Sequence, residues 1–395
     1  MSNDRVVIVS AKRTPIGSFQ GNFESLKATE LASRVIEKNI NDISINPKEI
    51  DETIMGCVLS AGLGQAPARQ AAMGAGIPSE SGATTINKMC GSGMKSIMFG
   101  HDSIKAQQNN IVVAGGLENM TNAPYILSKA RKGFRMGHAD VKDHMFLDGL
   151  EDAYEEGKLM GSFAEDTSEH YQFTREQQDN FAITSLERAK KANEDGTFDS
   201  EIVPIKVLNR KNEIIINKDE QPFKSDITKI PTLRPAFRKN GTVTAANSSS
   251  ISDGASSVIL MLESEAQKRG IKPLARIIDH STNSQEPKWF TTAPIGAIEK
   301  VLEKSGWKKT DVDLFEVNEA FAVVPMAVMK DIGISNDILN IYGGACALGH
   351  PVGASGTRIV ATLINALKKN NLKKGVASLC IGGGEATALT LEIIN

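Results

Sequence analysis

Short apolar runs alternate with stretches of helical spacing along most of the chain. The runs are rich in β-branched residues, and they cover Val6–Val9, Ile54–Leu59, Thr84–Asn87, Ile111–Ala114, Ser257–Met261, Leu314–Val317, Leu339–Ile341 and Val376–Cys380. Apolar positions in the stretches between several of these runs recur every three or four residues, as they do on one face of a helix. Strands that alternate with helices predict a layered α/β fold.

Two stretches of the chain repeat the same order of features. The first has a Gly-rich turn at 90–93, a helical pattern, the apolar run 111–114 and a pair of glycines. The second has a Gly-containing turn at 354–356, a helical pattern, the apolar run 376–380 and three glycines. Because helical and extended periods follow in the same order, we predict an internal duplication, with two similar α/β halves packed together.

The stretch between the two halves is richer in charged residues and indicates an insertion. We predict an N-terminal half from residues 1–120 and 248–272, an inserted loop domain from residues 121–247, and a C-terminal half from residues 273–395. Long loops on a rigid scaffold commonly hold a ligand. The inserted domain is therefore the part that we expect to grip a substrate.

The composition narrows the range of partners. The chain has 395 residues, of which 41% are hydrophobic and 23% charged, with a formal net charge of −2. A charge this small gives no electrostatic footprint for nucleic acid or for an anionic membrane. The four cysteines at positions 57, 90, 346 and 380 are not closely paired, which argues against a disulfide framework and fits a reducing compartment.

The N-terminal segment shows no targeting pattern. Met1–Arg5 leads directly into an apolar run, without the apolar core of a signal peptide or the Arg- and Ser-rich pattern of a transit peptide. No uncharged apolar run reaches the length that spans a membrane. We therefore expect a cytoplasmic enzyme with no membrane partner.

Cys90 is a candidate nucleophile. It follows one predicted strand and precedes a predicted helix, with glycines at 91 and 93. A helix N-terminus lowers the pKa of a thiol, because the dipole and the free N–H groups favour the thiolate. The alternative is a small buried hydrophobic residue, as most free cysteines are.

A histidine, a second thiol and an amide are the other candidates. His350 lies in a Gly-rich loop, and it is the obvious base to activate a cysteine. Cys380 ends a predicted strand before three glycines, and is either a functional thiol or a packed one. Asn318 follows the run at 314–317, where its amide orients a water or a carbonyl, or caps a helix.

Zinc binding is a further alternative for Cys90, Cys346, His350 and Cys380. The spacing of Cys346 and His350 suits zinc, but structural sites usually show a second close pair of ligands. The surrounding glycines offer N–H donors to an anion rather than ligands to a cation. We therefore expect no metal here, and we expect Cys346 and Cys57 to pack in the core.

Six segments together resemble the thiolase family, most closely its acetyl-CoA acetyltransferase branch. They run nearly from end to end, and they are Arg13–Gly17, Asn87–Gly93, Gly115–Met120, Asn318–Phe321, the His350 loop and Cys380–Gly384. The resemblance implies a thiolase-like α/β fold, in which two duplicated halves pack as layers α-β-α-β-α with an inserted loop domain.

The resemblance also implies a Claisen chemistry in two steps. Cys90, activated by His350, attacks a thioester and holds the acetyl group. Cys380 then takes a proton from the methyl group of a second acetyl-CoA, and the carbanion attacks the acetyl-cysteine. By the same resemblance, His350 and a water held by Asn318 stabilise the enolate oxygen, while the backbone N–H groups of Cys90 and Gly382 stabilise the tetrahedral intermediate. Coenzyme A thioesters are then substrates, and no cofactor is expected.

The family motifs further suggest which residues meet the substrate. The inserted domain is expected to grip coenzyme A, with the serine of an Ala-Asn-x-Ser segment, residues along the pantetheine path, and lysines near the nucleotide phosphates. The residues expected to contact coenzyme A or the acyl group are Ser249, Phe237, Met160, Lys224, Lys229, Phe321 and Phe290.

Two departures from the family pattern bear on the substrate. Leu159 stands where short-chain members commonly carry a histidine, and the segment Pro287–Phe290, near the acyl pocket, carries an aromatic where a methionine is usual. A degradative thiolase for longer 3-ketoacyl-CoA is therefore the alternative function. A decarboxylating ketosynthase would not need Cys380, and an inactive acyl-CoA-binding scaffold would not need all four catalytic groups. The family forms dimers and tetramers, so we expect a homo-oligomer.

Overall fold

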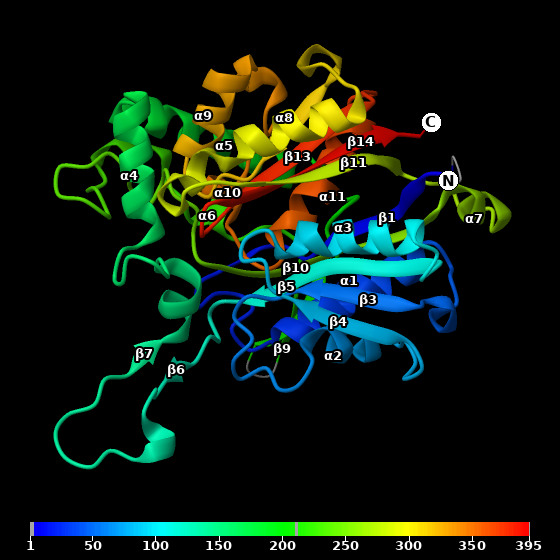
Figure 1. The fold of residues 1–395 in the computed structure, drawn as a ribbon, viewed down its shortest axis with the longest axis horizontal. Helices are drawn as coiled ribbons and strands as arrows, with labels where there is room; N and C mark the ends of the chain where they lie inside the picture. Colours follow the sequence, from blue (N-terminus) through cyan, green and yellow to red (C-terminus); the bar gives the residue numbers. More distant parts are fainter. Residues whose placement is uncertain (1–3, 210–211, 395) are drawn as a thin grey trace.

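The predicted alternation of strands and helices builds one ten-stranded sheet with helices on its faces (Figure 1). The computed structural model describes residues 4–209 and 212–394. The N-terminal half contributes β1 (Val6–Arg13), β2 (Gly17–Ser18), β3 (Glu52–Gly56), β4 (Gly82–Ile86), β5 (Ile111–Asn119) and β10 (Ser252–Leu262). Its helices are α1 (Ala28–Asp42), α2 (Pro67–Gly74), α3 (Ser92–Lys105) and α7 (Glu263–Lys268).

The C-terminal half repeats this arrangement. Its strands are β11 (Ala275–Ser284), β12 (Leu314–Val317), β13 (Lys374–Ile381) and β14 (Glu385–Ile393). Its helices are α8 (Ala293–Ser305), α9 (Val323–Val328), α10 (Ala345–Leu348) and α11 (Ser355–Lys369). The strand order is β1-β10-β5-β3-β4 in one half and β11-β14-β13-β12 in the other, and the second strand of each order is antiparallel to both neighbours. The predicted duplication is therefore confirmed.

The two halves of the sheet enclose α3 and α11 (Figure 1). The outer faces are covered by α1 and α2 on one side and by α8 on the other, which gives the predicted layers α-β-α-β-α. Only Asn365, Lys368 and Lys369 of the fifteen residues of α11 are not buried. A helix between two apolar sheet faces is buried on nearly all sides, and the mixed apolar cluster around α3 and α11 draws residues from both halves.

The predicted strand at 339–341 is wrong. Leu339 makes a single parallel bridge to Phe315, in the place where a fifth strand would continue the sheet of the C-terminal half. Asn340 then turns the chain with a φ of 46°, and its side-chain amide both accepts from the N–H of Val317 (2.8 Å) and donates to the carbonyl of Val317 (2.8 Å). An amide that pairs with the edge of β12 thus replaces a strand.

The inserted segment carries its own elements. They are β6 (Tyr125–Ile126), β7 (Lys142–Asp143), α4 (Met160–Tyr171), α5 (Arg175–Glu194), β8 (Ile205–Asn209), β9 (Asn212–Ile216) and α6 (Gln221–Lys224). The β6–β7 arm projects from the body of the molecule (Figure 1). Val203, Ile205 and Val207 pack in the core of the N-terminal half, and the segment limits drawn from the sequence stay a prediction. No helix among the described residues is long and apolar enough to cross a membrane.

Candidate active site

The N-termini of α3 and α11 meet between the two halves of the sheet. The Thr357 hydroxyl donates to the carbonyl of Gly93 (2.7 Å). A Cβ on Gly356 would lie 2.2 Å from the backbone nitrogen of Met94, so glycine is required for the helices to approach this closely. Since Cys90 precedes α3 by two residues and His350 precedes α11 by five, this contact brings their loops together.

Cys90 is held in a strained turn. The preceding residue, Met89, has a φ of 47°, a left-handed conformation that is uncommon outside glycine. Hydrogen bonds fix this turn: the N–H of Met89 donates to the Asn87 side chain (2.9 Å), and the Ser92 hydroxyl donates to the carbonyl of Met89 (2.6 Å). Strain of this kind persists where the surroundings over-determine a conformation, which is common at functional sites.

Cys90 and Cys380 are brought near each other, because a Cβ on Gly91 would lie 2.4 Å from the Ile381 side chain and Cys90 acts electrostatically on Cys380. The N–H groups of Gly382 and of Cys90 itself donate to the Cys90 sulfur, yet burial outweighs them and raises the pKa of this thiol to about 11. Burial raises the pKa of Cys380 well above its usual value, and the neighbouring Cys90 raises it further. The expected lowering of the Cys90 pKa by the helix N-terminus is therefore wrong, because desolvation dominates. Both groups are neutral thiols at pH 7.

His350 is a neutral imidazole with one nitrogen free to act. Its Nδ1 lies 2.5 Å from the Ser355 hydroxyl, which itself donates to the carbonyl of Pro351 (3.0 Å). Because that hydroxyl has only one proton, Nδ1 must carry the imidazole proton and donate it to Ser355. Nε2 is buried and has no partner among the described residues. Burial, and secondarily the charge of Arg358, lowers the pKa of His350 to about 3.

Asn318 presents an unpaired donor. Its backbone N–H donates to the carbonyl of Ser378 (3.0 Å) in β13, two residues before Cys380. Its Oδ1 accepts from the guanidinium of Arg358 (3.2 Å), which fixes the orientation of the amide, and Nδ2 is buried without a partner among the described residues. The N-cap of α9 is Ala322, so the helix-cap alternative for Asn318 is wrong.

An aromatic wall adjoins the sulfur pair. The rings of Phe237 and Phe290 both pack edge-on against Phe321, with centroids 5.9 and 6.5 Å apart. Met160 lies between this wall and the glycine turn, because a Cβ on Gly382 would lie 3.3 Å from the Met160 sulfur. These four predicted substrate-binding residues and Gly382 thus belong to one region of the structure.

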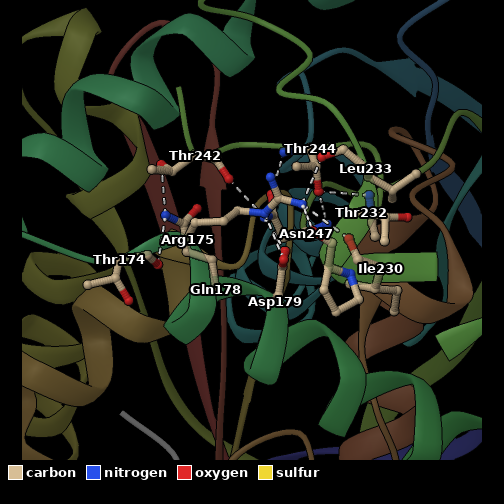
Figure 2. Close-up of polar contacts among 12 residues, drawn as sticks. Thr174, Arg175, Gln178, Asp179, Ile230, Thr232, Leu233, Thr242, Thr244 and Asn247 are labelled. Atoms are coloured by element: carbon tan, nitrogen blue, oxygen red, sulfur yellow. Dashed lines mark hydrogen bonds and ion pairs between the residues drawn. The ribbon is translucent and has the colours of Figure 1, made fainter. Parts of the chain in front are cut away.

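A network inside the insertion holds the segment that carries Ser249 (Figure 2). Arg175 pairs with Asp179 (2.7 Å) and donates to the carbonyl of Leu233 (2.9 Å). Asp179 also accepts from the amide of Asn247 (3.0 Å), two residues before Ser249. The N–H of Ser249 then donates to the carbonyl of Ala320 (2.9 Å), which places this serine beside the aromatic wall.

Lys224 and Lys229 lie apart from the sulfur pair. They border a cavity of about 260 Å³ that is also lined by Cys346, Ala246 and Leu186. Their ammonium groups pair with neighbouring carboxylates, at 2.6 Å from Glu220 and 3.7 Å from Asp226 respectively. A larger cavity, of about 1130 Å³, lies at the far end of α11 and is lined by none of the predicted site residues.

Two residues that sequence reasoning missed support the site. Ser355 fixes the tautomer of His350, as described above. Glu118 is buried and accepts from the N–H groups of Val58 (3.0 Å), Leu59 (3.0 Å) and Gly353 (2.9 Å), so it ties the His350 loop to the turn after β3. Burial raises the pKa of Glu118 to about 7. The sequence does show Glu118 as an acidic residue at the end of an apolar run, but the N–H groups that donate to it are distant in the sequence.

Known proteins show the same organisation. Residues 6–264 match the model of the N-terminal thiolase domain, and residues 271–393 match that of the C-terminal thiolase domain. The chain is 50% identical over 390 residues to a probable acetyl-CoA acetyltransferase of Dictyostelium discoideum, which covers 98% of this chain and 94% of that protein.

Two solved structures are similar over nearly the whole length. The Bacillus anthracis acetyl-CoA acetyltransferase superposes with a TM-score of 0.96 at 40% identity and covers 99% of both chains. A thiolase from Ascaris suum in complex with coenzyme A superposes with a TM-score of 0.94 at 41% identity, covering 99% of this chain and 100% of that one. Since the models of both thiolase domains match in order and together span nearly the whole sequence, this chain belongs to the thiolase family.

Proposed function

We propose that the protein is an acetyl-CoA C-acetyltransferase. It condenses two molecules of acetyl-CoA to acetoacetyl-CoA and coenzyme A, and it catalyses the reverse thiolysis. The observation that carries this proposal is the pair of neighbouring thiols, Cys90 and Cys380, with the N–H group of Gly382 donating to the Cys90 sulfur. The names of the relatives described above support the same reaction.

The first step transfers an acetyl group to Cys90. As its sulfur attacks the thioester carbon, the thiol proton passes to Nε2 of His350, the free nitrogen of the imidazole. Because burial disfavours both a thiolate and an imidazolium, proton transfer accompanies formation of the carbon–sulfur bond. The negative charge then develops on the carbonyl oxygen, where the N–H groups of Cys90 and Gly382 receive it. The departing coenzyme A thiolate takes the proton of Cys380.

The second step uses Cys380 as a base. Because the proton of Cys380 leaves with coenzyme A in the first step, Cys380 enters the second step as a thiolate. It removes a methyl proton from a second acetyl-CoA, and His350, now carrying the proton of Cys90, donates to the enolate oxygen together with a water on Nδ2 of Asn318. The carbanion attacks the acetyl group, and Cys90 leaves with the proton from His350.

The aromatic wall favours a short acyl group. Phe290 and Phe321 are both nearly fully buried, pack against each other and share an apolar cluster with Cys380, which supports a confined acyl pocket. No contact among the described residues adds support for longer acyl chains. We expect efficient thiolysis of a C4 3-ketoacyl-CoA and weak thiolysis of a C10 substrate, and comparable rates with both would support the degradative alternative.

The proposed reaction also bears on the cofactors, the compartment and the subunit assembly of the enzyme. The reaction needs only coenzyme A thioesters, with no further cofactor, and we place it in cytoplasmic fatty acid metabolism. We also propose a homo-oligomer, a dimer or a tetramer. The half-buried edge strand β4 and the exposed side chains of Met73 and Phe99 support an association of this kind. Native mass spectrometry measures the number of subunits.

Acyl trapping tests the division of labour between the two thiols. With isotope-labelled acetyl-CoA, we expect mass spectrometry to find no acetylated protein for Cys90→Ala. We expect Cys380→Ala to be acetylated on Cys90 but to form no acetoacetyl-CoA, because the general base is missing. Cys57→Ala, which changes a buried thiol in the core of the N-terminal half, is the matched control. Condensation by either active-site variant at the wild-type rate would contradict the assignment.

A further inference from the structure

A cluster of metal-ligating side chains joins the two halves away from the sulfur pair. His101 and Asp102 lie in α3 of the N-terminal half, and His280 lies in β11 of the C-terminal half. Nε2 of His280 lies 3.3 Å from Nδ1 of His101 and 2.9 Å from Oδ1 of Asp102, and the last two atoms are 3.0 Å apart. Three potential ligand atoms therefore form a nearly equilateral triangle.

The size of this triangle suits one metal ion. Ligand bonds of about 2.0–2.2 Å to imidazole nitrogen and carboxylate oxygen place neighbouring ligand atoms about 2.8–3.1 Å apart in octahedral geometry and about 3.3–3.6 Å apart in tetrahedral geometry. We propose that His101, Asp102 and His280 form a binding site for a divalent transition-metal ion that prefers imidazole ligands, such as Zn²⁺ or Ni²⁺. Water would complete the coordination.

The three ligand atoms can be held either by protons or by one cation. A carboxylate only accepts hydrogen bonds, and each neutral imidazole nitrogen either donates or accepts. In the absence of a metal, one oxygen of Asp102 accepts from both imidazole nitrogens, at 3.0 and 2.9 Å. If one accepts, its lone pair faces a lone pair of the carboxylate at 3.0 Å or less. A cation at the centre uses all three lone pairs at once.

The surroundings permit entry and hold the ligands in place. The side chains of His101 and His280 are 15% and 12% exposed, whereas Asp102 is 56% exposed, so the cluster is open on one side. The two imidazole rings meet edge-to-face, with centroids 5.0 Å apart. The nearby Lys304 pairs with Asp279 (2.6 Å), which offsets its charge. A bound ion would link α3 to β11 and hold the two halves together.

This role is separate from catalysis. His101 follows the start of α3 by nine residues, or about 14 Å along the helix axis. We therefore expect the metal to stabilise the fold without being required for turnover. The inference does not depend on the proposed function, and the thiolysis rate of chelator-treated protein reports on that function separately.

Metal titration of the full-length protein tests the site. After chelator treatment, we expect one Zn²⁺ ion to bind by calorimetry, with an affinity at least about tenfold weaker in His101→Ala and His280→Ala. His138→Ala, which alters an exposed histidine outside the cluster, is the control and should bind as the wild type does. Any zinc bound by the active-site thiols would remain in all of these variants. The difference in zinc affinity between the wild type and the cluster variants therefore reports on the cluster alone.

A substitution at the protein surface distinguishes loss of metal binding from loss of the folded state. Asp102→Asn changes a half-exposed side chain, keeps its volume, and should weaken binding while thiolysis of acetoacetyl-CoA in chelator stays at the wild-type rate. Zn²⁺ should also raise the Tm of the wild type, in proportion to the logarithm of the ion concentration above its Kd, but not that of the variants. Equal affinity in wild type and all three cluster variants, or no saturable binding by the wild type, would overturn the proposal.

Discussion

The working state of His350 depends on one hydroxyl group. Ser355 accepts from Nδ1 and so leaves Nε2 as the basic nitrogen. In Ser355→Ala this buried N–H loses its acceptor and the tautomer is no longer fixed. We expect kcat to fall about 10- to 100-fold, the size of one unpaired buried donor, with little change in KM.

Steady-state thiolysis of acetoacetyl-CoA measures this effect. Ser355→Thr keeps the hydroxyl and should recover most of the rate. An equal loss in both variants would point to packing at the start of α11 instead of tautomer control. A pH profile adds a second readout, since loss of the fixed tautomer should change the pH dependence of kcat.

Glu118 should make stability depend on pH. Burial raises its folded pKa to about 7, above the ordinary value of 4.5, so the folded state binds this proton more tightly than the unfolded chain does. The resulting stability is fully present below pH 4.5 and is lost as the pH rises through 7. The difference of about 2.5 pKa units corresponds to about 3 kcal/mol.

Comparison with Glu118→Gln isolates this contribution. The variant should gain stability relative to the wild type between pH 5 and pH 8, because only the wild type must bury a charge at the higher pH. Urea unfolding at each pH measures the difference, which cancels the opposite effect of buried His350. A difference that is independent of pH would show that Glu118 is ionised throughout.

The sequence motifs identified the candidate site residues, but they did not predict the protonation states of those residues. Cys90 and His350 carry recognisable neighbours and lie just before α3 and α11, while the catalytic roles of these two residues and of Cys380 and Asn318 stay a prediction. The direction of the Cys90 pKa shift was mispredicted, because the local sequence shows the helix that follows but not the depth of burial. Desolvation depends on residues from the whole chain.

At the scale of elements, the approach of α3 and α11 depends on glycine. A Cβ on Gly356 would lie 2.2 Å from the backbone nitrogen of Met94, where neither helix has room to give. Gly356→Ala should therefore push the helices apart and destabilise the protein by about 1–3 kcal/mol, as overpacking does. It should also lower kcat, because the Cys90 turn and the His350 loop move with their helices.

Substitution of a second glycine distinguishes a steric clash between the helices from the general effect of adding a methyl group. A Cβ on Gly149 would meet its nearest neighbour, a Leu59 methyl group, at 3.4 Å, which is ordinary contact. Gly149→Ala should therefore leave the rate and the Tm close to those of the wild type. If Gly356→Ala behaved in the same way, the close approach of the two helices would not be what aligns the site.

The elements also show where a local pattern misleads. Leu339–Ile341 has the composition of a strand, but Asn340 bends the chain and lends its side chain to the edge of β12. Conversely, β5 continues through Gly115 and Gly116 to Asn119, although glycine is unfavourable in strands. The reason is again tertiary, since a Cβ on Gly116 would lie 1.9 Å from the carbonyl oxygen of Gly353 in the His350 loop.

At the scale of the whole molecule, duplication accounts for the architecture. The repeated order of turn, helix, strand and glycines was visible in the sequence, and it predicted two similar halves. The join between them was not visible, because β1 and β11 pair only at Val7 and Ile8, through residues that resemble any other apolar strand. The active site forms at the inner helices of both halves, so neither half is expected to work alone.

This arrangement predicts that the two halves unfold together. The apolar cluster around α3 and α11 includes Ile97 and Met98 from one half and Leu363 and Leu379 from the other, so loss of either half exposes the core of its neighbour.

Two buried thiols report on the halves separately: Cys57 is 2% exposed, and Cys380 is 0% exposed. A brief pulse of a thiol reagent at increasing urea concentration, followed by peptide mass spectrometry, gives a labelling midpoint for each. We expect the two midpoints to coincide with each other and with the fluorescence transition of Trp289 and Trp307, because a shared core makes partial unfolding costly. A Cys57 midpoint well below that of Cys380 would mean that the halves are independent units, and that contact between them contributes little to stability.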